Sequence, residues 1–542
     1  MKLQIAQFNP RVGDVQQNLQ LILGHLEAAK IAGCDGILFP ELAVIGYPPR
    51  DLLAYPRLYR ENQTALEAIR KNSSGLTVIV GALAMNQSGS GKKFYNSAFV
   101  YRDQKEICVY HKRLLPSYDI FEEDRFFEAG TRPGSFEWKG RRFGLAICED
   151  IWNQSGFLET QYLEDPLKEL KDQGLSGLFV LSASPFELGK PQVRQKLVGD
   201  VAKELNCPVF FCNQVGANDE LIFDGSSLIA NAQGEIVARA PAFKTHTITW
   251  ESGVSSGIST PPATSEDWLW ESLVLGVQDY FKKNHQRRAC IGLSGGIDSS
   301  VAAVLAVAAL GKENVWGVSL PSRFTSSASR EDARTLAQRL GIAFQEISIE
   351  PVFQAYETTL AALRPSGLTL ENLQPRIRMA VLMALCNEKQ LLLLNTSNKS
   401  EIATGYSTLY GDSAGALAPL GDLTKTQVRA LALGCNRSAE IVPLRVIERA
   451  PSAELRPDQK DEDSLPPYAV LDVLVDACLV DKKGPEELLA AGFEEKWVSS
   501  FAQLHRVSEF KRHQFPPVLR VSPKAFGSGR RIPITCRSYT DK

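Results

Sequence analysis

The chain has 542 residues, of which 44% are hydrophobic and 23% are charged, a composition that excludes a disordered or fibrous protein, and its length predicts about two to four domains. The 60 basic side chains nearly balance the 62 acidic ones, so the net charge is −2, which disfavours nucleic acid or a membrane as partner and favours small-molecule substrates. The sequence has no apolar run typical of a signal or membrane segment, and its ten cysteines follow neither a disulfide nor a zinc pattern, so we expect a cytoplasmic protein.

The first half of the chain shows the patterns of an α/β domain of mixed strand order. Short apolar runs typical of strands recur, and helical patterns fall between some of them. The predicted strands cover residues 3–8, 36–40, 76–83, 97–101, 106–110, 142–148, 175–182, 208–213 and 226–231. The predicted helices cover residues 16–32 and 191–205. We therefore predict a first domain at residues 1–250, followed by a linker at 251–266 that is rich in Ser, Gly, Thr and Pro.

Three side chains with catalytic potential stand at the ends of predicted strands in this domain. Glu41 follows one buried strand, Lys112 follows another, and Cys148 ends the apolar run at 143–147. A free cysteine is more often a small buried hydrophobe than a nucleophile. The presence of Glu41 and Lys112 in the same domain favours a catalytic role for Cys148.

The motifs FPEL, HKRLLP and CEDIW that contain these side chains resemble those of the nitrilase, or carbon–nitrogen hydrolase, superfamily. The resemblance implies an αββα sandwich and a catalytic triad of Glu41, Lys112 and Cys148. In such a triad the cysteine attacks an amide carbonyl, and the glutamate acts as general base and then as acid. The lysine stabilises the oxyanion and favours the thiolate.

The same resemblance implies a glutamine-binding site next to the triad. Tyr118, Ser184 and Lys190 match residues that hold the glutamine substrate. A further carboxylate close to the triad comes from either Glu122 or Glu123, and the sequence leaves this choice open.

After the linker, strands and helices alternate in the manner of successive βαβ units, and we predict a second domain at residues 267–542. The predicted strands cover residues 289–293, 315–320, 343–349 and 391–395. The predicted helices cover residues 299–310 and 329–340. This order implies a parallel, doubly wound, Rossmann-like sheet that binds ligands at the carboxyl ends of its strands.

The loop SGGIDSS after the first of these strands has the features of a pyrophosphate site. Its glycines let the backbone approach an anion, and the following helix N-terminus offers free N–H groups. The loop lacks the lysine of a P-loop and the spacing of a dinucleotide motif, and it resembles the ATP pyrophosphatase family, whose members adenylate a substrate while releasing pyrophosphate. The resemblance implies that Asp298 is a magnesium ligand. The implied ATP contacts are Gly292, Leu293, Ser294, Gly295, Gly296, Ile297, Asp298 and Ser299.

Further along, the segments LNTSNKSE, GYSTLYGD and APLGDLTKTQ resemble the synthetase domain of NAD synthetases. This resemblance implies that Thr396 contacts ATP and that Glu401 lies at the magnesium and substrate site. It also implies that Asn372 and Lys524 bind deamido-NAD. Lys425 is a further candidate phosphate contact.

Two local features of this domain allow structural predictions. Thr424 is predicted to cap a helix together with Gln427. Pro375 is predicted in a first helical turn, where proline is tolerated.

Together the two halves resemble the glutamine-dependent NAD(+) synthetase family along nearly the whole chain. The implied reaction, the last step of NAD biosynthesis, converts deamido-NAD, ATP, L-glutamine and water to NAD, AMP, diphosphate and L-glutamate. It passes through a cysteine thioester, released ammonia and an acyl-adenylate, with Mg²⁺ as cofactor, in a homo-oligomer with paired synthetase domains. Two alternatives stay open: the same chemistry with another acceptor, or an inactive amidase scaffold attached to an ammonia-only synthetase.

Overall fold

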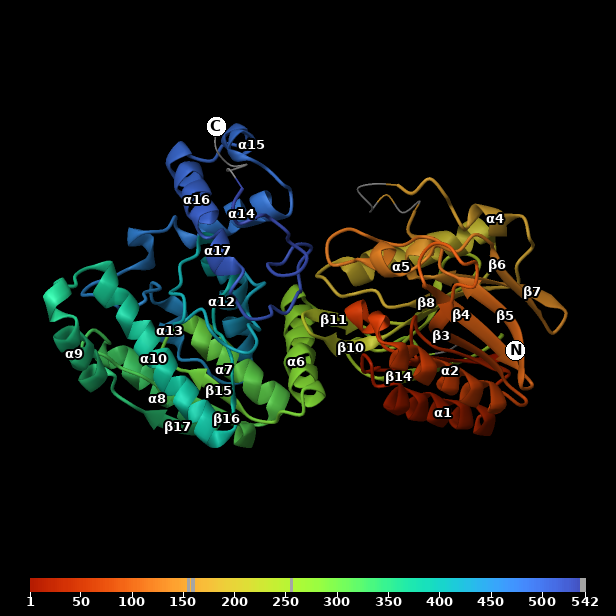
Figure 1. The fold of residues 1–542 in the computed structure, drawn as a ribbon, viewed down its shortest axis with the longest axis horizontal. Coiled ribbons are helices and arrows are strands. Elements are labelled where there is room, and N and C mark those ends of the chain that lie inside the picture. Colours follow the sequence, from red (N-terminus) through yellow and green to blue (C-terminus); the bar gives the residue numbers. More distant parts are fainter. Residues whose placement is uncertain (154–155, 157–160, 254–256, 537–542) are drawn as a thin grey trace. The chain divides into compact units, whose positions relative to one another are not determined.

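The computed structural model describes residues 1–153, 156, 161–253 and 257–536. The chain divides into two compact units, Met1–Ala263 and Thr264–Lys542 (Figure 1). This division falls within the predicted linker, of which residues 254–256 lie outside the described residues. Among the described residues, no helix combines the length and the apolar character needed to cross a membrane.

The first unit is built on two six-stranded sheets that contain both parallel and antiparallel pairs. One sheet has the order β14-β1-β2-β3-β4-β5 and the other β13-β12-β9-β8-β7-β6. The strands of the first sheet are β1 (Lys2–Gln7), β2 (Gly36–Leu38), β3 (Thr77–Met85), β4 (Phe94–Arg102), β5 (Lys105–His111) and β14 (His246–Glu251). The strands of the second sheet are β6 (Gly134–Trp138), β7 (Arg141–Ile147), β8 (Leu178–Ser182), β9 (Val209–Asn213), β12 (Leu228–Ala230) and β13 (Ile236–Arg239). A separate hairpin pairs β10 (Val215–Asn218) with β11 (Leu221–Asp224).

Helices cover the outer faces of both sheets. Apolar side chains of the two sheets, including Ile5 and Phe179, share one core between the sheets. A second core lies between the first sheet and helices α1 (Val15–Ile31) and α2 (Pro56–Lys71), and a third between the second sheet and helices α4 (Lys168–Lys171) and α5 (Lys190–Leu205). Figure 1 shows these helix pairs on opposite sides of the strands. The predicted αββα sandwich is confirmed, and inner strands such as β3 and β8 are continuous apolar runs because both of their faces are buried.

The second unit contains a four-stranded parallel sheet with the order β17-β16-β15-β18. Its strands are β15 (Ala289–Gly292), β16 (Val315–Ser319), β17 (Ala343–Glu346) and β18 (Leu392–Leu393). The chain runs from β15 to one side for two strands and then crosses to the other side for β18. This reversal confirms the doubly wound fold and places a switch point at the carboxyl end of β15, where such sheets bind ligands.

Helices of the second unit cover the sheet and form a separate core near the end of the chain. The longer helices are α6 (Ser265–Lys283), α7 (Ile297–Leu310), α8 (Ser327–Leu340), α9 (Glu350–Thr359), α10 (Leu368–Lys389), α12 (Lys425–Cys435), α14 (Tyr468–Leu479) and α16 (Glu495–Val507). The short ones are α11 (Lys399–Thr404), α13 (Leu444–Glu448), α15 (Pro485–Ala490) and α17 (Glu509–Arg512). The predicted cap of α12 is confirmed, because Thr424 and Gln427 exchange side chain to backbone hydrogen bonds.

Pro375 departs from its predicted place. It lies well inside α10 and not in a first helical turn. Its ring packs against the backbone at Gly411, where an added Cβ would lie 2.9 Å from the Cβ of Pro375. A proline inside a helix removes a backbone hydrogen bond and is normally avoided. At this position the proline packs against the loop around Gly411.

Candidate active sites

In the first unit, the structure brings the predicted carboxylate and ammonium into direct contact. Glu41 follows β2 and Lys112 follows β5, and Lys112 Nζ lies 2.7 Å from Glu41 Oε1. Both residues are 1% exposed. Glu41 also accepts hydrogen bonds from Asn96 Nδ2 at 2.7 Å and from the Ala183 N–H at 2.9 Å. These donors compensate the loss of water around a buried carboxylate and fix its orientation.

Cys148 stands on a turn held by another carboxylate. It is the first residue of the 3-10 turn Cys148–Ile151, and its φ of +44° lies in the left-handed region, which is costly for a residue with a Cβ. Asp150 accepts hydrogen bonds from the N–H groups of Ile147 at 2.9 Å and Leu114 at 2.9 Å. Asp150 thus ties the strained turn to the segment that follows Lys112.

The thiol of Cys148 is neutral in this environment. Burial raises its pKa and the neighbouring Glu41 raises it further, whereas Lys112 offsets only part of this effect. The Lys112 ammonium favours the thiolate, as expected, but burial and Glu41 outweigh its effect on the pKa of Cys148. The Ser182 hydroxyl lies 3.4 Å from Cys148 Sγ and donates to it. A neutral thiol next to a carboxylate suits nucleophilic attack in which the base removes the proton.

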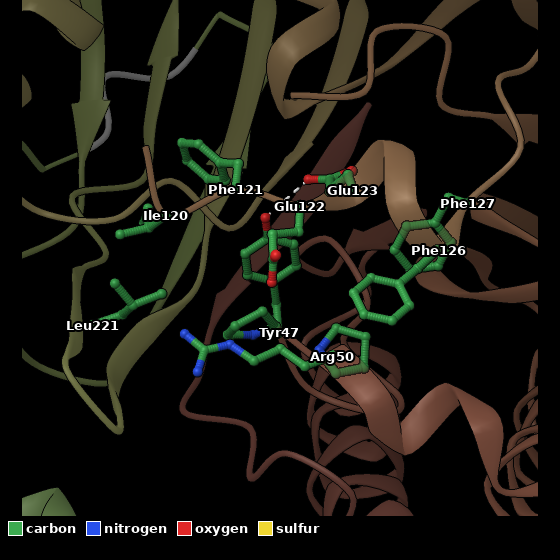
Figure 2. Close-up of a pocket in the computed structure, with 11 residues that line it drawn as sticks. Tyr47, Arg50, Ile120, Phe121, Glu122, Glu123, Phe126, Phe127 and Leu221 are labelled. Atoms are coloured by element: carbon green, nitrogen blue, oxygen red, sulfur yellow. Dashed lines mark hydrogen bonds between the residues drawn. The ribbon is translucent and has the colours of Figure 1, made fainter. Parts of the chain in front are cut away.

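The structure places Glu123, and not Glu122, at the triad. Glu123 Oε1 lies 2.8 Å from Lys112 Nζ, and the Tyr47 hydroxyl donates to it at 2.9 Å (Figure 2). Glu122 is partly exposed and pairs with Arg125 at 3.8 Å. Burial, together with the charge of Glu41, raises the pKa of Glu123 to about 7. A cavity of about 20 Å³ lies against Tyr47 and Glu123, which is room for about one water molecule.

Two of the predicted glutamine-binding residues, Tyr118 and Lys190, lie near a carboxylate that the sequence did not single out. Glu149 is 4% exposed and accepts hydrogen bonds from the hydroxyls of Tyr118 at 3.0 Å and Tyr162 at 3.1 Å. Burial raises the pKa of Glu149, and Lys190 is among the charges that lower it. The Lys190 ammonium lies 5.8 Å from the centre of the Trp152 ring. A carboxylate and an ammonium close to a nucleophile suit a zwitterionic substrate.

Ser184 lies two residues after Ser182, whose hydroxyl donates a hydrogen bond to Cys148. It is buried, and its N–H donates to Asn213 Oδ1 at 2.9 Å. This bond fixes the backbone of Ser184 beside the triad.

In the second unit, the loop between β15 and α7 has the shape of an anion cradle. Gly295 has a φ of +78°, and an added Cβ would overlap the Ser329 carbonyl, so only glycine fits. Ser294 Oγ accepts a hydrogen bond from the Gly296 N–H at 3.1 Å and lies 3.1 Å from Ser299 Oγ. The loop is therefore shaped before any ligand binds.

Next to this loop, one ammonium bridges two carboxylates. Lys425 Nζ lies 2.6 Å from Asp298 Oδ2 and 3.3 Å from Glu401 Oε1. Asn398 Nδ2 donates to Asp298 Oδ1 at 2.9 Å. Burial and the charge of Asp298 raise the pKa of Glu401 to about 8, and the two carboxylates raise the pKa of Lys425.

Asp298 and Glu401 fit the role of ligands to a magnesium ion whose remaining ligands would include phosphate oxygens. The described residues contain no cluster of three or more metal-binding side chains, but Asp298 and Glu401 offer two carboxylates within reach of one ammonium. Burial and the neighbouring Asp298 raise the pKa of Glu401, and a bound cation would favour its ionised form. Mg²⁺ commonly uses one or two carboxylates together with substrate phosphates.

The remaining predicted residues lie on separate segments of this unit. Thr396 is half-buried after β18. Asn372 lies on α10 and accepts a hydrogen bond from Thr408 Oγ1 at 2.7 Å. Lys524 donates to the Gly529 carbonyl.

Comparison with known proteins assigns both units. A carbon–nitrogen hydrolase model matches residues 2–256 and an NAD synthase model matches residues 269–515. The chain is 42% identical to the glutamine-dependent NAD(+) synthetase of Synechocystis sp., over 98% of each chain, and 39% identical to that of Acinetobacter baylyi, again over 98% of each. The chain belongs to the glutamine-dependent NAD(+) synthetase family. The members of this family are carbon–nitrogen ligases.

Solved structures of glutamine-dependent NAD(+) synthetases share the architecture. The structure from Acinetobacter baumannii, in complex with adenosine diphosphate, is 35% identical, has a TM-score of 0.78 and covers 100% of this chain and 99% of its own. The structure from Cytophaga hutchinsonii, at 23% identity, has a TM-score of 0.84 and covers 99% and 98% of the two chains, which shows the fold.

Within this NAD(+) synthetase fold, sequence reasoning missed Asn96, Glu149 and Asp150. Asn96 lies near the start of strand β4, and its amide contacts Glu41, 55 positions away in the chain. The other two directly follow Cys148, and this adjacency was the available signal.

Proposed function

We propose that this chain synthesises NAD from deamido-NAD, ATP and L-glutamine, with AMP, diphosphate and L-glutamate as the other products. The observation that carries the proposal is the presence of both chemistries in one chain. A buried Glu41–Lys112 pair stands beside Cys148, and a glycine cradle stands beside the Asp298–Lys425–Glu401 cluster. Family membership supports the same reaction.

In the first unit, glutamine is held by its charged end. Glu149 pairs with the α-ammonium of glutamine and Lys190 with its α-carboxylate, which brings the side-chain amide to Cys148. Tyr118 orients Glu149 through its hydroxyl, and Ser184 lines the same site.

The amide is then cleaved through a covalent intermediate. Glu41 takes the thiol proton as Cys148 Sγ attacks the amide carbon, and Lys112 stabilises the oxyanion. Glu41 returns the proton to the leaving nitrogen, so that ammonia departs and a thioester remains. Water, deprotonated by Glu41, hydrolyses the thioester to glutamate and regenerates the thiol.

In the second unit, ATP binds with its phosphates on the loop formed by residues 292–299 and with Thr396 as a further contact. The carboxylate of deamido-NAD attacks the α-phosphorus of ATP, which breaks the bond between the α- and β-phosphates, so that diphosphate leaves and the acyl-adenylate forms. Asp298 and Glu401 would hold Mg²⁺, which supplies positive charge against the phosphates when bound. Lys425 adds a fixed positive charge at the same place.

Ammonia then attacks the acyl-adenylate, forms the amide of NAD and expels AMP. Asn372 and Lys524 hold deamido-NAD during this step. Only the unprotonated form of ammonia is a nucleophile, so we propose that the ammonia is transferred without release to solvent.

The expected setting of the enzyme stays as predicted, a cytoplasmic homo-oligomer. All ten cysteines are free, which fits a reducing compartment. Tyr356, Leu363 and Leu368 are exposed on the second unit and are side chains that a paired synthetase unit would cover.

The identity of the acceptor is tested by AMP formation. Purified protein is incubated with ATP, Mg²⁺, glutamine and one of several carboxylate acceptors. We expect AMP in proportion to the product amide with deamido-NAD, and background levels with the other acceptors. AMP formation with another acceptor but not with deamido-NAD would contradict the proposal.

A further inference from the structure

The helix that carries Glu401 and the segment that carries Lys524 are fastened to each other at two places. The helix is α11, and the segment runs over residues 521–530, which we call the C-terminal segment. One fastening lies at the start of α11 and the other at its end.

The first fastening is a buried lysine. Lys399, 1% exposed, begins α11, and its Nζ lies 2.8 Å from Ser522 Oγ and 3.1 Å from Asp422 Oδ1. Asp422 Oδ2 in turn accepts the N–H groups of Val521 at 2.8 Å and Ser522 at 2.7 Å. The start of α11 and the start of the C-terminal segment thus share one ion pair.

The second fastening is a chain of polar groups that begins at the carbonyl oxygen of Ala403. His505 Nδ1 lies 2.8 Å from this oxygen, and Arg512 Nη1 donates to it at 2.9 Å. Arg530 Nη2 lies 3.0 Å from His505 Nε2, and Arg530 Nη1 lies 2.7 and 2.8 Å from the two carboxylate oxygens of Glu509.

The histidine in this chain is neutral. Burial lowers the pKa of His505 well below its usual value, and Arg512 and Arg530 lower it further. In the neutral ring, Nδ1 donates to Ala403 and Nε2 accepts from Arg530, and this is the tautomer that satisfies both neighbours.

Phe526 holds the middle of the C-terminal segment in place by packing against two arginines of the second fastening. Its ring lies 5.6 Å from the Arg512 guanidinium and 5.5 Å from the Arg530 guanidinium, and the residue is buried. Lys524 therefore lies between two fixed points.

From this arrangement we propose that Arg530 is a positioning residue of the synthetase reaction. Acting with His505 and Glu509, it fixes the position of Lys524 relative to Glu401, so that both side chains contact the same bound deamido-NAD molecule. Buried charge networks add little net stability compared with apolar packing, but they impose a defined geometry. A defined geometry is what the positioning of Lys524 requires. The inference rests on the role of Lys524 given under the proposed function.

A double-mutant cycle tests whether Arg530 acts through Lys524. The variants are Lys524→Ala, Arg530→Ala and the double variant, assayed with ammonia as nitrogen donor for kcat/KM toward deamido-NAD. We expect each single variant to lose about tenfold or more, and the double variant to be within about twofold of Lys524→Ala. A double variant whose loss equals the product of the two single losses would overturn the inference, as would an Arg530→Ala variant with unchanged kcat/KM.

Arg531→Ala is the matched control, because Arg531 is the exposed neighbour of Arg530, and we expect its kcat/KM within about twofold of the unaltered protein. Circular dichroism and thermal unfolding of the whole chain report whether the second unit of each variant is folded. If Arg530→Ala is unfolded, Arg530→Lys, which keeps the charge but cannot contact both His505 and Glu509 through a guanidinium, replaces it in the cycle with the same criteria. Failure of the proposed function is a separate result, namely that the unaltered protein forms no NAD.

Discussion

The two candidate sites differ in how complete they are before substrate binds. In the first unit, Glu41 and Lys112 already touch and are closed off from water, with Cys148 beside them. In the second unit, Asp298 and Glu401 share one lysine, and burial together with the charge of Asp298 raises the pKa of Glu401. The proposed glutaminase site is thus preassembled, whereas the proposed nucleotide site would be completed by a cation and phosphates.

The substitution Cys148→Ala should separate the activities of the two sites most clearly. We expect glutamine-supported NAD synthesis to fall by at least about 1,000-fold, because the nucleophile is lost. Synthesis supported by ammonium salts should stay within about twofold. Loss of both activities would contradict the division of labour between the units.

Asp298→Asn should give the converse pattern. We expect synthesis from either nitrogen source to fall by about 100-fold, because the site loses a carboxylate that offsets Lys425 and serves the cation. Glutamine hydrolysis, followed as glutamate release, should persist. Unchanged synthesis in this variant would remove Asp298 from the mechanism.

The substitution Glu123→Gln should reduce the activity of the first site by a smaller factor than Cys148→Ala. Lys112 keeps Glu41 but loses its second carboxylate, so we expect the glutaminase kcat to fall by about 10- to 100-fold. Glu122→Gln is the matched control, since Glu122 is partly exposed, and it should be within about twofold. Equal losses in the two variants would contradict the assignment of Glu123.

Lys190→Ala should affect substrate binding more than turnover. Removing the partner of the glutamine carboxylate should raise KM for glutamine by about tenfold with little change in kcat. Lys196→Ala, on the exposed face of the same helix, should leave KM unchanged. A fall in kcat alone would place Lys190 outside the binding site.

The smallest expected effect is a pH dependence of stability that depends on Glu123. Its pKa rises from a usual 4.5 to about 7 in the folded protein, so the folded state holds a proton that the unfolded state has lost. Stability from this group is therefore full below about pH 4.5 and is lost as the pH rises toward 7. The Tm of the unaltered protein minus that of Glu123→Gln should fall by a few degrees between pH 5 and 7. A difference that rises over this range would contradict the raised pKa.

The sequence predicts those parts of the molecule that depend on local pattern. Strands such as β3 and β8 are continuous apolar runs, and the glycine loop before α7 has a local shape, so both could be predicted. Asn96 and the position of Pro375 could not, because each depends on a partner from a distant segment. The choice between Glu122 and Glu123 likewise needed the tertiary contact with Lys112.

In the proposed reaction, nitrogen passes from glutamine to NAD within one chain. The most direct test supplies deamido-NAD, ATP, Mg²⁺ and glutamine labelled with ¹⁵N in its amide, and measures the label in NAD by mass spectrometry. We expect the label in the nicotinamide carboxamide, with one AMP formed for each NAD. NAD without label, or labelled glutamine hydrolysed with no NAD formed, would contradict the account.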